Sequence, residues 1–463
     1  MKAEPARRII GLLKSWFGDF EKQELLKFLK LGVIFGFVIG VYWTMRPLKD
    51  SIFASMVHAQ NQPLAKLLSL IVLFPMVMLY SVLIDTFTTA KHRIFYVLGA
   101  LYAFGTLIFA YLFMHPTIGL ANTTVDATRI VAWTWYVFVE SYGSLLVALF
   151  WAFAADMVNP ESAKRGFPLV IMIGQIGSIL GPLLLTPLGK NYFGNSGPTV
   201  AICGGLIIVL MVLVFLFVRT TPKSQLHGYH GRVTPQAEVG HNKDAGFFEG
   251  LTLLVRQKYL LGIFGIIAFY EIITQIIDFN FKVLVYNSFA SEALRTEYLG
   301  SNAVLLNLVA FLSLLFGVSN IQRRFGIKTS LVLMPLIVAG MVASFWAYPV
   351  VHTVFWIVVV GKAMNYALNG PALKQLYVPT TKEVKYKSQT WIETFGSRGS
   401  KSAAAGFNLL QKPFTTWWGL AGVSYLITIG TVMSFGLIGL WFVVARFLGK
   451  KYEHAVAHNE VVC

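Results

Sequence analysis

The sequence predicts an all-α integral membrane protein with about twelve transmembrane helices in two six-helix halves. Of its 463 residues, 56% are hydrophobic and only 13% are charged, whereas soluble domains are about 25% charged. The apolar residues gather in segments about 20 residues long, which is the length that crosses a bilayer as a helix. One long polar stretch, from Thr220 to Lys258, divides these segments into two sets of six.

Hydropathy and turn residues place the individual spans. Apolar residues of the first 30 positions, such as Ile9, Leu13 and Trp16, share one helical face and predict an amphipathic helix on the membrane surface. The predicted domains are this cytoplasmic helix (1–30), an N-terminal half (31–219), a cytoplasmic central loop (220–258), a C-terminal half (259–448) and a cytoplasmic tail (449–463). The predicted spans are 31–53, 64–85, 94–114, 130–157, 166–188, 199–219, 260–288, 299–319, 329–350, 353–378, 388–410 and 422–446.

Basic residues predict the orientation. The net charge of +17 comes largely from alternate loops, and the positive-inside rule then places both termini and the central loop in the cytoplasm. We expect a multi-pass protein of a bacterial inner membrane, with the lipid bilayer rather than nucleic acid as its partner. The oligomeric state is left open. The basic loops contain Lys91 and Arg93, Lys164 and Arg165, Lys223 to Lys258, Arg323 to Lys328, and Lys382 to Lys387.

The first span is the most informative segment. It ends in Arg46, Lys49 and Asp50, and charges inside a membrane are costly enough to require a function or a partner. Tyr42, Arg46 and Lys49 share one helical face, which suits a ligand with a flat ring and phosphates. Charges that snorkel to the membrane surface, beside an interfacial aromatic belt, are the alternative interpretation. Glycines at four-residue spacing earlier in this span predict close helix packing: Gly32, Gly36 and Gly40.

Carboxylates lie within two other spans. Glu140, in the fourth span, must pair, be protonated or face water, and its candidate partners are Lys49 and Lys362. In the seventh span, acidic, amide and basic side chains at spacings of four, three and four form one polar stripe that predicts a hydrated cavity. Asp278 and Lys282 could simply form an ion pair within the helix. The stripe consists of Glu271, Gln275, Asp278 and Lys282.

The tenth and eleventh spans are the least apolar. Gly370-Pro371 predicts a kink, and Tyr366, Arg398 and Lys401 are candidate ligand contacts. The glycine spacing near Lys401 does not match a phosphate-binding loop, so ATP hydrolysis is not expected. The sequence shows no catalytic nucleophile with a base and no metal-ligand cluster, and it predicts no cofactor. Shifting the chain by 222 residues superposes Glu140 on Lys362 and also the span boundaries, which predicts a parallel repeat of the two halves.

Several motifs resemble those of one family in the same order. Residues 46–51 resemble the RPLKD signature of the nucleotide transporter family, the ATP/ADP translocases of intracellular bacteria and plastids. The segment around Glu140 is similar to that family's E-x-W-G-S element, with Tyr142 in place of tryptophan. Asp278 to Lys282 resemble its E-V-T-W-K element, with Asp in place of Glu. Tyr377-Val-Pro379 resembles its Y-I-P element, and residues 398–402 resemble its R-L-G-K-S element.

The resemblance implies a major-facilitator-like fold that moves nucleotides, not an enzyme. It points to Lys49, Glu140, Asp278 and Lys401 on the substrate path. Where the family has K-Y-S-L-F-D-P-T-K-E-M, this chain reads NYALNGPALKQ over residues 365–375. Transport of another nucleotide and proton-coupled import therefore stay open beside ATP/ADP exchange. Two different functions also stay open: a carrier of another phosphorylated or anionic metabolite, and a membrane transferase.

These inferences give each candidate residue a role. We expect alternating access, with phosphates bound by cations and the base stacked on aromatic rings. The expected substrate-binding residues are Arg46, Lys49, Glu140, Asp278, Lys282, Arg398, Lys401, Tyr42, Tyr136 and Tyr366. Trp43 is a further stacking candidate. The expected coupling residues are Asp50, Glu140, Glu271 and Lys362.

Overall fold

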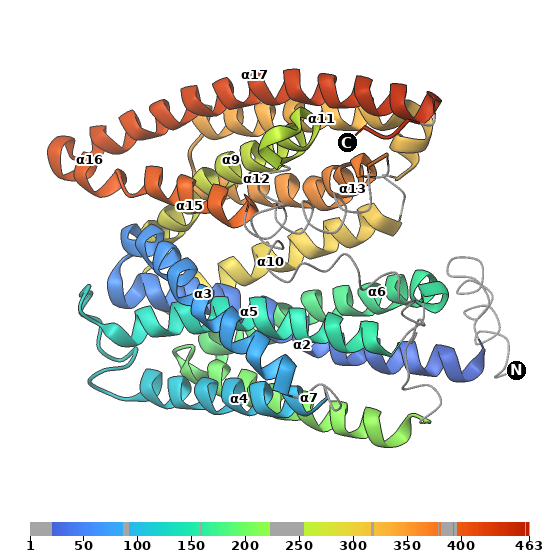
Figure 1. The fold of residues 1–463 in the computed structure, drawn as a ribbon. Coiled ribbons are helices and arrows are strands. Elements are labelled where there is room, and N and C mark those ends of the chain that lie inside the picture. Colours follow the sequence, from blue (N-terminus) through green and yellow to red (C-terminus); the bar gives the residue numbers. More distant parts are fainter. Residues whose placement is uncertain are drawn as a thin grey trace, which may run out of the picture. The chain divides into compact units, whose positions relative to one another are not determined.

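The computed structural model describes residues 21–86, 92–157, 160–222, 254–315, 319–377, 379–380, 392, 396–458 and 460–462. Throughout these residues the regular secondary structure is helical (Figure 1). Eight of the described helices are long and apolar enough to cross a membrane. The predicted amphipathic helix over residues 1–20 and nearly all of the central loop lie outside the described residues.

The first half of the sequence forms six long helices. The first of them begins at Lys22, nine residues before the predicted span, and continues without a break through Pro47. These helices are α2 (Lys22–Val57), α3 (Gln62–Thr86), α4 (His92–Met114), α5 (Ile130–Asp156), α6 (Pro160–Leu185) and α7 (Gly197–Thr220), with short turns η1 (Ala59–Asn61) and η2 (Gly189–Phe193).

The second half repeats this order with more interruptions. Its helices are α9 (Lys258–Ser288), α10 (Glu292–Leu315), α11 (Ser319–Ala347), α12 (Val351–Met364), α13 (Gly370–Leu376), α15 (Ser397–Asn408), α16 (Gln411–Trp418) and α17 (Leu420–His458). Between α12 and α13 lies η5 (Asn365–Asn369), a π-helical turn. The kink predicted at Gly370-Pro371 thus takes the form of a widened turn, because proline has no N–H to donate to the preceding turn.

The chain divides into two compact units that do not follow the sequence halves exactly. The first unit comprises Met1–Val57, Ile71–Val233 and Ser291–Val304, and the second comprises His58–Leu70, Thr234–Ala290 and Leu305–Cys463. The helices α3 and α10 are therefore each divided between the units. The start of α3 belongs to the second unit and its remainder to the first, whereas the start of α10 belongs to the first unit and its remainder to the second. The domain boundaries predicted from the sequence stay a prediction.

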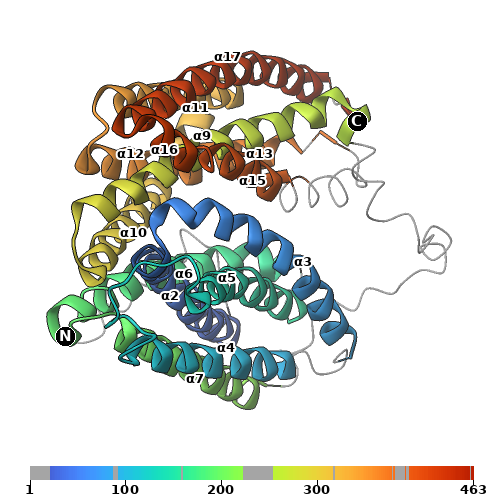
Figure 2. The same ribbon diagram turned by 90° about the vertical axis from the view of Figure 1, so that its left-hand side faces the viewer.

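The internal packing of the second unit matches that of the first. In the first unit α2 packs against α6, α5 and α7, and α4 packs against α7. In the second unit α9 packs against α15, α12 and α17, and α11 packs against α17. Figures 1 and 2 both show α4 beside α7 and α11 beside α17. The equivalent pairs agree with the repeat predicted from the 222-residue shift.

The glycines of α2 allow α6 to approach its backbone, as the sequence predicts. A Cβ atom on Gly177 of α6 would lie 2.2 Å from the carbonyl oxygen of Gly36, and one on Gly181 would lie 2.4 Å from that of Gly40. A Cβ on Gly40 would in turn lie 3.0 Å from the carbonyl oxygen of Gly177. The two helices therefore touch along their backbones, the arrangement that small residues permit in membranes. This contact fixes α2, which carries the charged segment.

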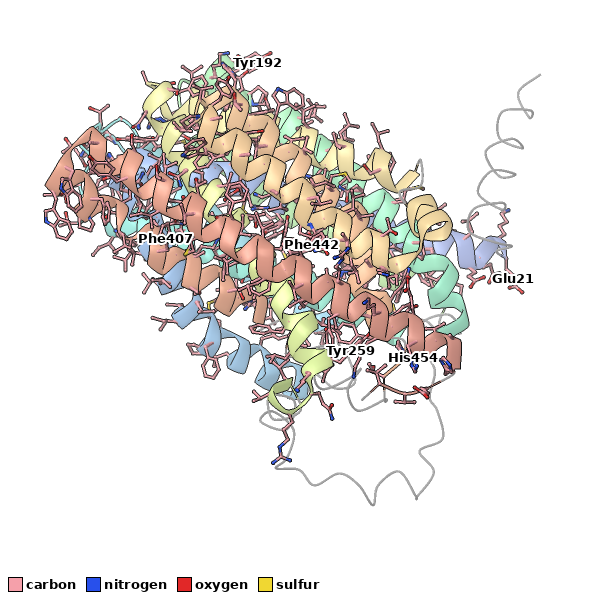
Figure 3. The ribbon with its side chains drawn as sticks, turned by 90° about the horizontal axis from the view of Figure 1, so that it is seen from above. Glu21, Tyr192, Tyr259, Phe407, Phe442 and His454 are labelled. Carbon is pink, nitrogen blue, oxygen red and sulfur yellow. The ribbon has the colours of Figure 1, made fainter. Side chains whose placement is uncertain are left out.

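The outer faces of the helices are apolar. On α4, exposed side chains recur at spacings of three and four residues and form one stripe: Leu101, Phe104, Ile108 and Tyr111, which are 56–67% exposed. On α17, Figure 3 labels Phe442 midway along the helix and shows side chains projecting along its length. Because water-soluble proteins rarely expose such continuous apolar stripes, these faces suit contact with lipid.

Candidate functional site

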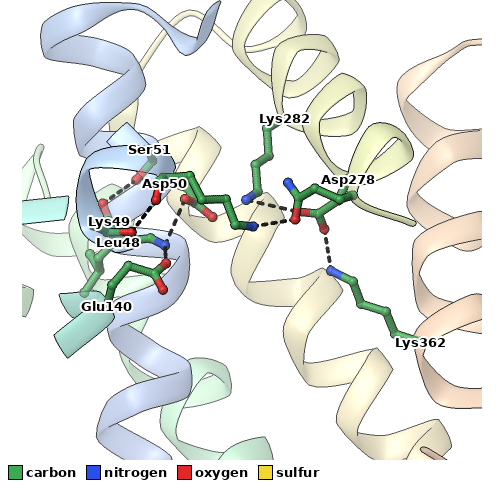
Figure 4. Close-up of polar contacts among 11 residues, drawn as sticks. Leu48, Lys49, Asp50, Ser51, Glu140, Asp278, Lys282 and Lys362 are labelled. Atoms are coloured by element: carbon green, nitrogen blue, oxygen red, sulfur yellow. Dashed lines mark hydrogen bonds and ion pairs between the residues drawn. The ribbon is translucent and has the colours of Figure 1, made fainter. Parts of the chain in front are cut away.

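Charged and polar side chains inside the helices form two groups, one in each unit. The Lys49 cluster, in the first unit, consists of Arg46, Lys49, Asp50, Tyr136 and Glu140. The Asp278 cluster, in the second unit, consists of Lys66, Glu271, Gln275, Asp278, Lys282, Lys362, Ser397 and Lys401. Figure 4 shows the central contacts of each.

In the Lys49 cluster, a lysine on α2 pairs with a carboxylate on α5. The Nζ atom of Lys49 donates to Oε1 of Glu140 and lies 3.5 Å from Oδ1 of Asp50 (Figure 4). The Lys49 side chain is only 4% exposed, and that of Glu140 is 28% exposed. A buried ammonium group needs such partners, because its loss of hydration is otherwise uncompensated. Of the two partners expected for Glu140, the structure selects Lys49.

Aromatic rings line the same cations. The Nζ atom of Lys49 lies 4.1 Å from the centre of the Tyr136 ring, and the Arg46 guanidinium lies 4.8 Å from that of Trp43 and 5.9 Å from that of Tyr42. Both are cation–π geometries. Tyr136 is 1% exposed, so in this conformation its ring supports Lys49. Stacking of Tyr136 on a substrate base stays a prediction.

In the Asp278 cluster, one buried carboxylate binds two lysines. Oδ2 of Asp278 lies 3.0 Å from Nζ of Lys282, one turn along α9. Oδ1 of Asp278 accepts a hydrogen bond from Nζ of Lys362 on α12 (Figure 4). The helical pair is therefore present, but it is part of a larger arrangement that joins two helices.

The remainder of the α9 stripe binds two further lysines. Oε1 of Glu271 lies 3.2 Å from Nζ of Lys401 and accepts a 2.9 Å hydrogen bond from Oγ of Ser397, both on α15. Nζ of Lys66, on α3, donates to Oε1 of Gln275. Glu271, Gln275 and Asp278 thus each contact a lysine from another helix, and Asp278 also contacts Lys282 of its own helix.

Two predicted residues lie near this cluster. Arg398 follows Ser397 on α15 and is half-buried, whereas Tyr366 lies in the π-helical turn η5 and is 49% exposed. The structure places both residues in the second unit without assigning them a ligand, so their roles stay predictions.

Sequence reasoning missed several residues. Lys66 is a single cation in an otherwise apolar span, and this isolation was the only available signal. Glu292, the first residue of α10, accepts hydrogen bonds from Oγ of Ser51 at 2.9 Å, from Oγ1 of Thr296 at 2.6 Å and from the backbone N–H of Ser196 at 3.1 Å. All four residues belong to the first unit, where they tie α10 to the end of α2. Nothing in the sequence pattern indicates this contact.

Neither cluster has the composition of a metal centre. In the described parts of the chain, no three His, Cys, Asp or Glu side chains come together in a way that could hold a metal ion. The lysines outnumber the carboxylates in the Asp278 cluster. Such a cluster favours anions with several oxygen atoms, since each ammonium group donates up to three hydrogen bonds.

Two helical units with matching internal packing and ion pairs inside apolar spans give a multi-pass membrane protein with a major-facilitator-like fold. The fold is similar to that of the nucleoside transporter NupG, with a TM-score of 0.59, 15% identity, and coverage of 90% of this chain and 98% of that one. It is also similar to a bacterial homologue of the lysosomal transporter Spinster, with a TM-score of 0.60, 13% identity, and coverage of 94% and 99%.

The chain belongs to the TLC ATP/ADP transporter family, whose profile matches residues 5–452. The ADP,ATP carrier protein 3 of Rickettsia bellii is 21% identical over 97% of this chain and 99% of its own length. The ADP,ATP carrier protein 1 of Rickettsia prowazekii is 22% identical over 99% and 100%. The corresponding carrier of Chlamydia pneumoniae is 22% identical over 97% and 96%. The family resemblance inferred from the motifs is confirmed.

Proposed function

We propose that this protein moves nucleotides, ATP and ADP or a related nucleotide, across the membrane by alternating access. The observation that carries the proposal is the Lys49–Glu140 pair between two helices that can span the membrane, in a chain that matches an ATP/ADP transporter family along nearly its whole length. Ion pairs are costly inside a membrane and persist where they serve a substrate path.

The carboxylates act as substitutes for substrate phosphates. Without substrate, Glu140 pairs with Lys49, and Asp278 is shared between Lys282 and Lys362. When a nucleotide enters, its phosphate oxygens replace the carboxylates as partners of the lysines, because phosphates accept strong charge-assisted hydrogen bonds. Arg46, Arg398 and Lys401 contribute further cations. The exchange of one anion for another keeps the lysines paired at each stage.

The base is held by aromatic rings. Tyr42 and Trp43 already contact the Arg46 guanidinium, so a flat purine or pyrimidine can extend this stack of planar groups. Tyr366 supplies a partly exposed ring in the second unit. Tyr136 orients Lys49 through its ring face. In this proposal the rings select a nucleotide over inorganic phosphate.

Coupling depends on how the carboxylates are neutralised after substrate leaves. When the lysines regain Glu140, Asp50 and Glu271 as partners, the empty protein can reorient, which gives net uptake. Proton binding to one of these carboxylates would then couple the uptake to pH. If the empty protein does not reorient, nucleotide exchange results. We propose that Lys362 belongs to this step, since it bridges α12 to Asp278 on α9.

The charge distribution supports the proposed orientation. Basic residues in alternate loops support cytoplasmic placement of both termini and the central loop. We propose that the protein lies in the inner membrane of a bacterium. Some residues of the predicted basic loops, such as Lys91, lie outside the described part of the chain.

A second carrier function is favoured by one observation. The stretch over residues 365–375 lacks acidic side chains, and in the structure it forms the widened turn η5 and α13. Together these features can adapt the site to another phosphorylated or anionic metabolite. A membrane transferase is the remaining alternative, and a chemical change in the substrate would distinguish it from a carrier.

The test is transport by purified protein in proteoliposomes. Uptake of labelled ATP and ADP is measured with empty vesicles, with internal nucleotide, and with a pH gradient, and unlabelled ATP, ADP, NAD and a sugar phosphate compete. We expect saturable uptake that unlabelled nucleotides inhibit. The labelled nucleotide extracted from the vesicles should be chemically unaltered. Stronger inhibition by the sugar phosphate would assign the protein to the second carrier function. A chemically altered product would identify a transferase.

A further inference from the structure

Lys66 joins the second unit from an unexpected part of the chain. It lies near the start of α3, in the segment His58–Leu70 that groups with the second unit. Its Nζ atom donates to the side-chain oxygen of Gln275 on α9, and its backbone carbonyl accepts a 2.7 Å hydrogen bond from Oγ of Ser69. The ammonium group is therefore held in place at the middle of the α9 stripe.

The contacts of α9 arrange the lysines in a row. Glu271, Gln275 and Asp278 share one helical face at spacings of four and three residues. Lys401 contacts the first, Lys66 contacts the second, and Lys282 and Lys362 contact the third. From Glu271 to Asp278 the helix rises about 10 Å, at 1.5 Å per residue. Three successive positions along this length thus each carry at least one ammonium group.

Lysines outnumber carboxylates in the contacts described along this row. Among the side chains that form it, four lysines face two carboxylates, and the central partner, Gln275, is a neutral amide. At the central position, the contact partner of Lys66 is thus an amide oxygen, which accepts a hydrogen bond but carries no formal charge. An extended row of cations complements an extended anion. A chain of two or three linked phosphates has this form, whereas a single phosphate covers only part of the row.

We propose that Lys66 is a phosphate-binding residue that selects nucleotides with two or three phosphates over monophosphates. The proposal rests on the proposed function and deepens it by assigning the polyphosphate chain to the row from Lys401 to Lys362. A single phosphate can bind at either end of the row without reaching its middle. A longer chain must pass Lys66, so the charge of Lys66 stabilises the longer chain more.

The experiment measures how phosphate number affects binding in matched variants. Uptake of labelled ATP is measured in proteoliposomes, with ATP, ADP and AMP as competitors, for the unaltered protein and for Lys66→Ala, Lys66→Arg and Gln275→Glu. Gln275→Glu keeps the lysine but neutralises its charge. Lys412→Ala removes an exposed lysine of the same unit and serves as the control.

We expect Lys66→Ala and Gln275→Glu to weaken ATP and ADP binding about tenfold or more, the usual range for a hydrogen bond to a charged group. AMP binding should change less than about threefold. Lys66→Arg should keep most of the discrimination, and Lys412→Ala should leave it unchanged. Equal changes for all three nucleotides, or no change, would overturn the proposal.

Folding is checked independently. Cys203 is fully buried, so in a Cys463→Ser background the reaction of its thiol with a fluorescent reagent on heating reports unfolding. If Lys66→Ala does not fold, Gln275→Glu decides the question, because it retains Lys66. If the unaltered protein neither transports nor binds a nucleotide, the proposed function fails. Thermal shifts with inorganic triphosphate and phosphate then test the row itself, and equal responses of the unaltered protein and Gln275→Glu would refute it.

Discussion

The ammonium group of Lys49 on α2 binds the carboxylate of Glu140 on α5, 91 residues later in the sequence. The side chain of Lys49 is almost completely buried, whereas Glu140 keeps partial access to its surroundings. Glu140 is thus the more accessible member of the pair. The pair joins α2 and α5 within the first unit.

Loss of Lys49 should abolish transport and lower stability. Lys49→Met removes the phosphate ligand and leaves Glu140 and Asp50 without their shared cation. We expect a loss of about 3 kcal/mol, the low end of the range for broken buried pairs because Glu140 is partly exposed. Unfolding is followed through the Cys203 thiol, and uptake is measured in proteoliposomes.

The matched control for Lys49 is the double variant Lys49→Met with Glu140→Gln. Removing both charges avoids an isolated carboxylate, so part of the lost stability should return while transport stays absent. Uptake that persists in either variant at the level of the unaltered protein would contradict the role of Lys49 in the substrate path.

Asp278→Asn should separate binding from turnover. The amide cannot neutralise Lys282 and Lys362, so a nucleotide should bind at least as tightly as before but leave more slowly. We expect a larger thermal shift with ATP and a lower maximal rate of uptake. The conservative variant Asp278→Glu should stay closer than Asp278→Asn to the unaltered protein, both in its thermal shift with ATP and in its maximal rate of uptake. Weaker nucleotide binding by Asp278→Asn would show that the carboxylate contacts the substrate favourably instead of substituting for it.

Gly177→Ala should force α2 and α6 apart. The new methyl group would meet the Gly36 carbonyl oxygen at 2.2 Å, and a backbone atom cannot move aside as a side chain can. We expect a loss of about 2 kcal/mol or more and a lower unfolding temperature. Gly205→Ala on α7 is the control, since nothing lies within 4 Å of its added Cβ. It should be neutral or stabilising by up to about 1 kcal/mol, and equal effects at both positions would argue against the backbone contact.

Glu292→Ala should weaken the attachment of α10 to the first unit. It leaves the hydroxyl groups of Ser51 and Thr296 and the N–H group of Ser196 without their shared acceptor, at an expected cost of about 2 kcal/mol. Glu297→Ala, on the same helix, breaks an ion pair with Lys190 whose side chains are 27% and 45% exposed. That change should cost less than about 1 kcal/mol. Comparable shifts in unfolding temperature would show that the Glu292 contacts contribute no more than a surface pair.

The sequence predicted features that repeat along one helix. Glycine spacing in the first span predicted the approach of another helix, and periodicity predicted that Asp278 and Lys282 lie together. It also predicted the helical architecture, because span length and apolarity are local properties. At Gly370-Pro371 the sequence predicted an irregularity in the helix, and the structure has a π-helical turn directly before Gly370.

Contacts between helices were harder to predict. Periodicity shows which residues share a face but not which helix packs against that face, so Glu140 had two candidate partners until the structure showed Lys49 beside it and Lys362 beside Asp278. Lys66 and Glu292 were missed for the same reason. Each is a single polar residue whose partners come from distant segments, and its role depends on tertiary packing.

The exchange of His58–Leu70 and Ser291–Val304 between the units has a consequence for expression of the protein in pieces. A cut within the central loop yields two fragments, and neither holds all the residues of one compact unit. Each fragment alone should therefore be degraded or aggregate, whereas co-expression should restore a stable complex by complementation. The two halves of the sequence thus depend on each other to complete their compact units, even though their internal packing follows a common plan.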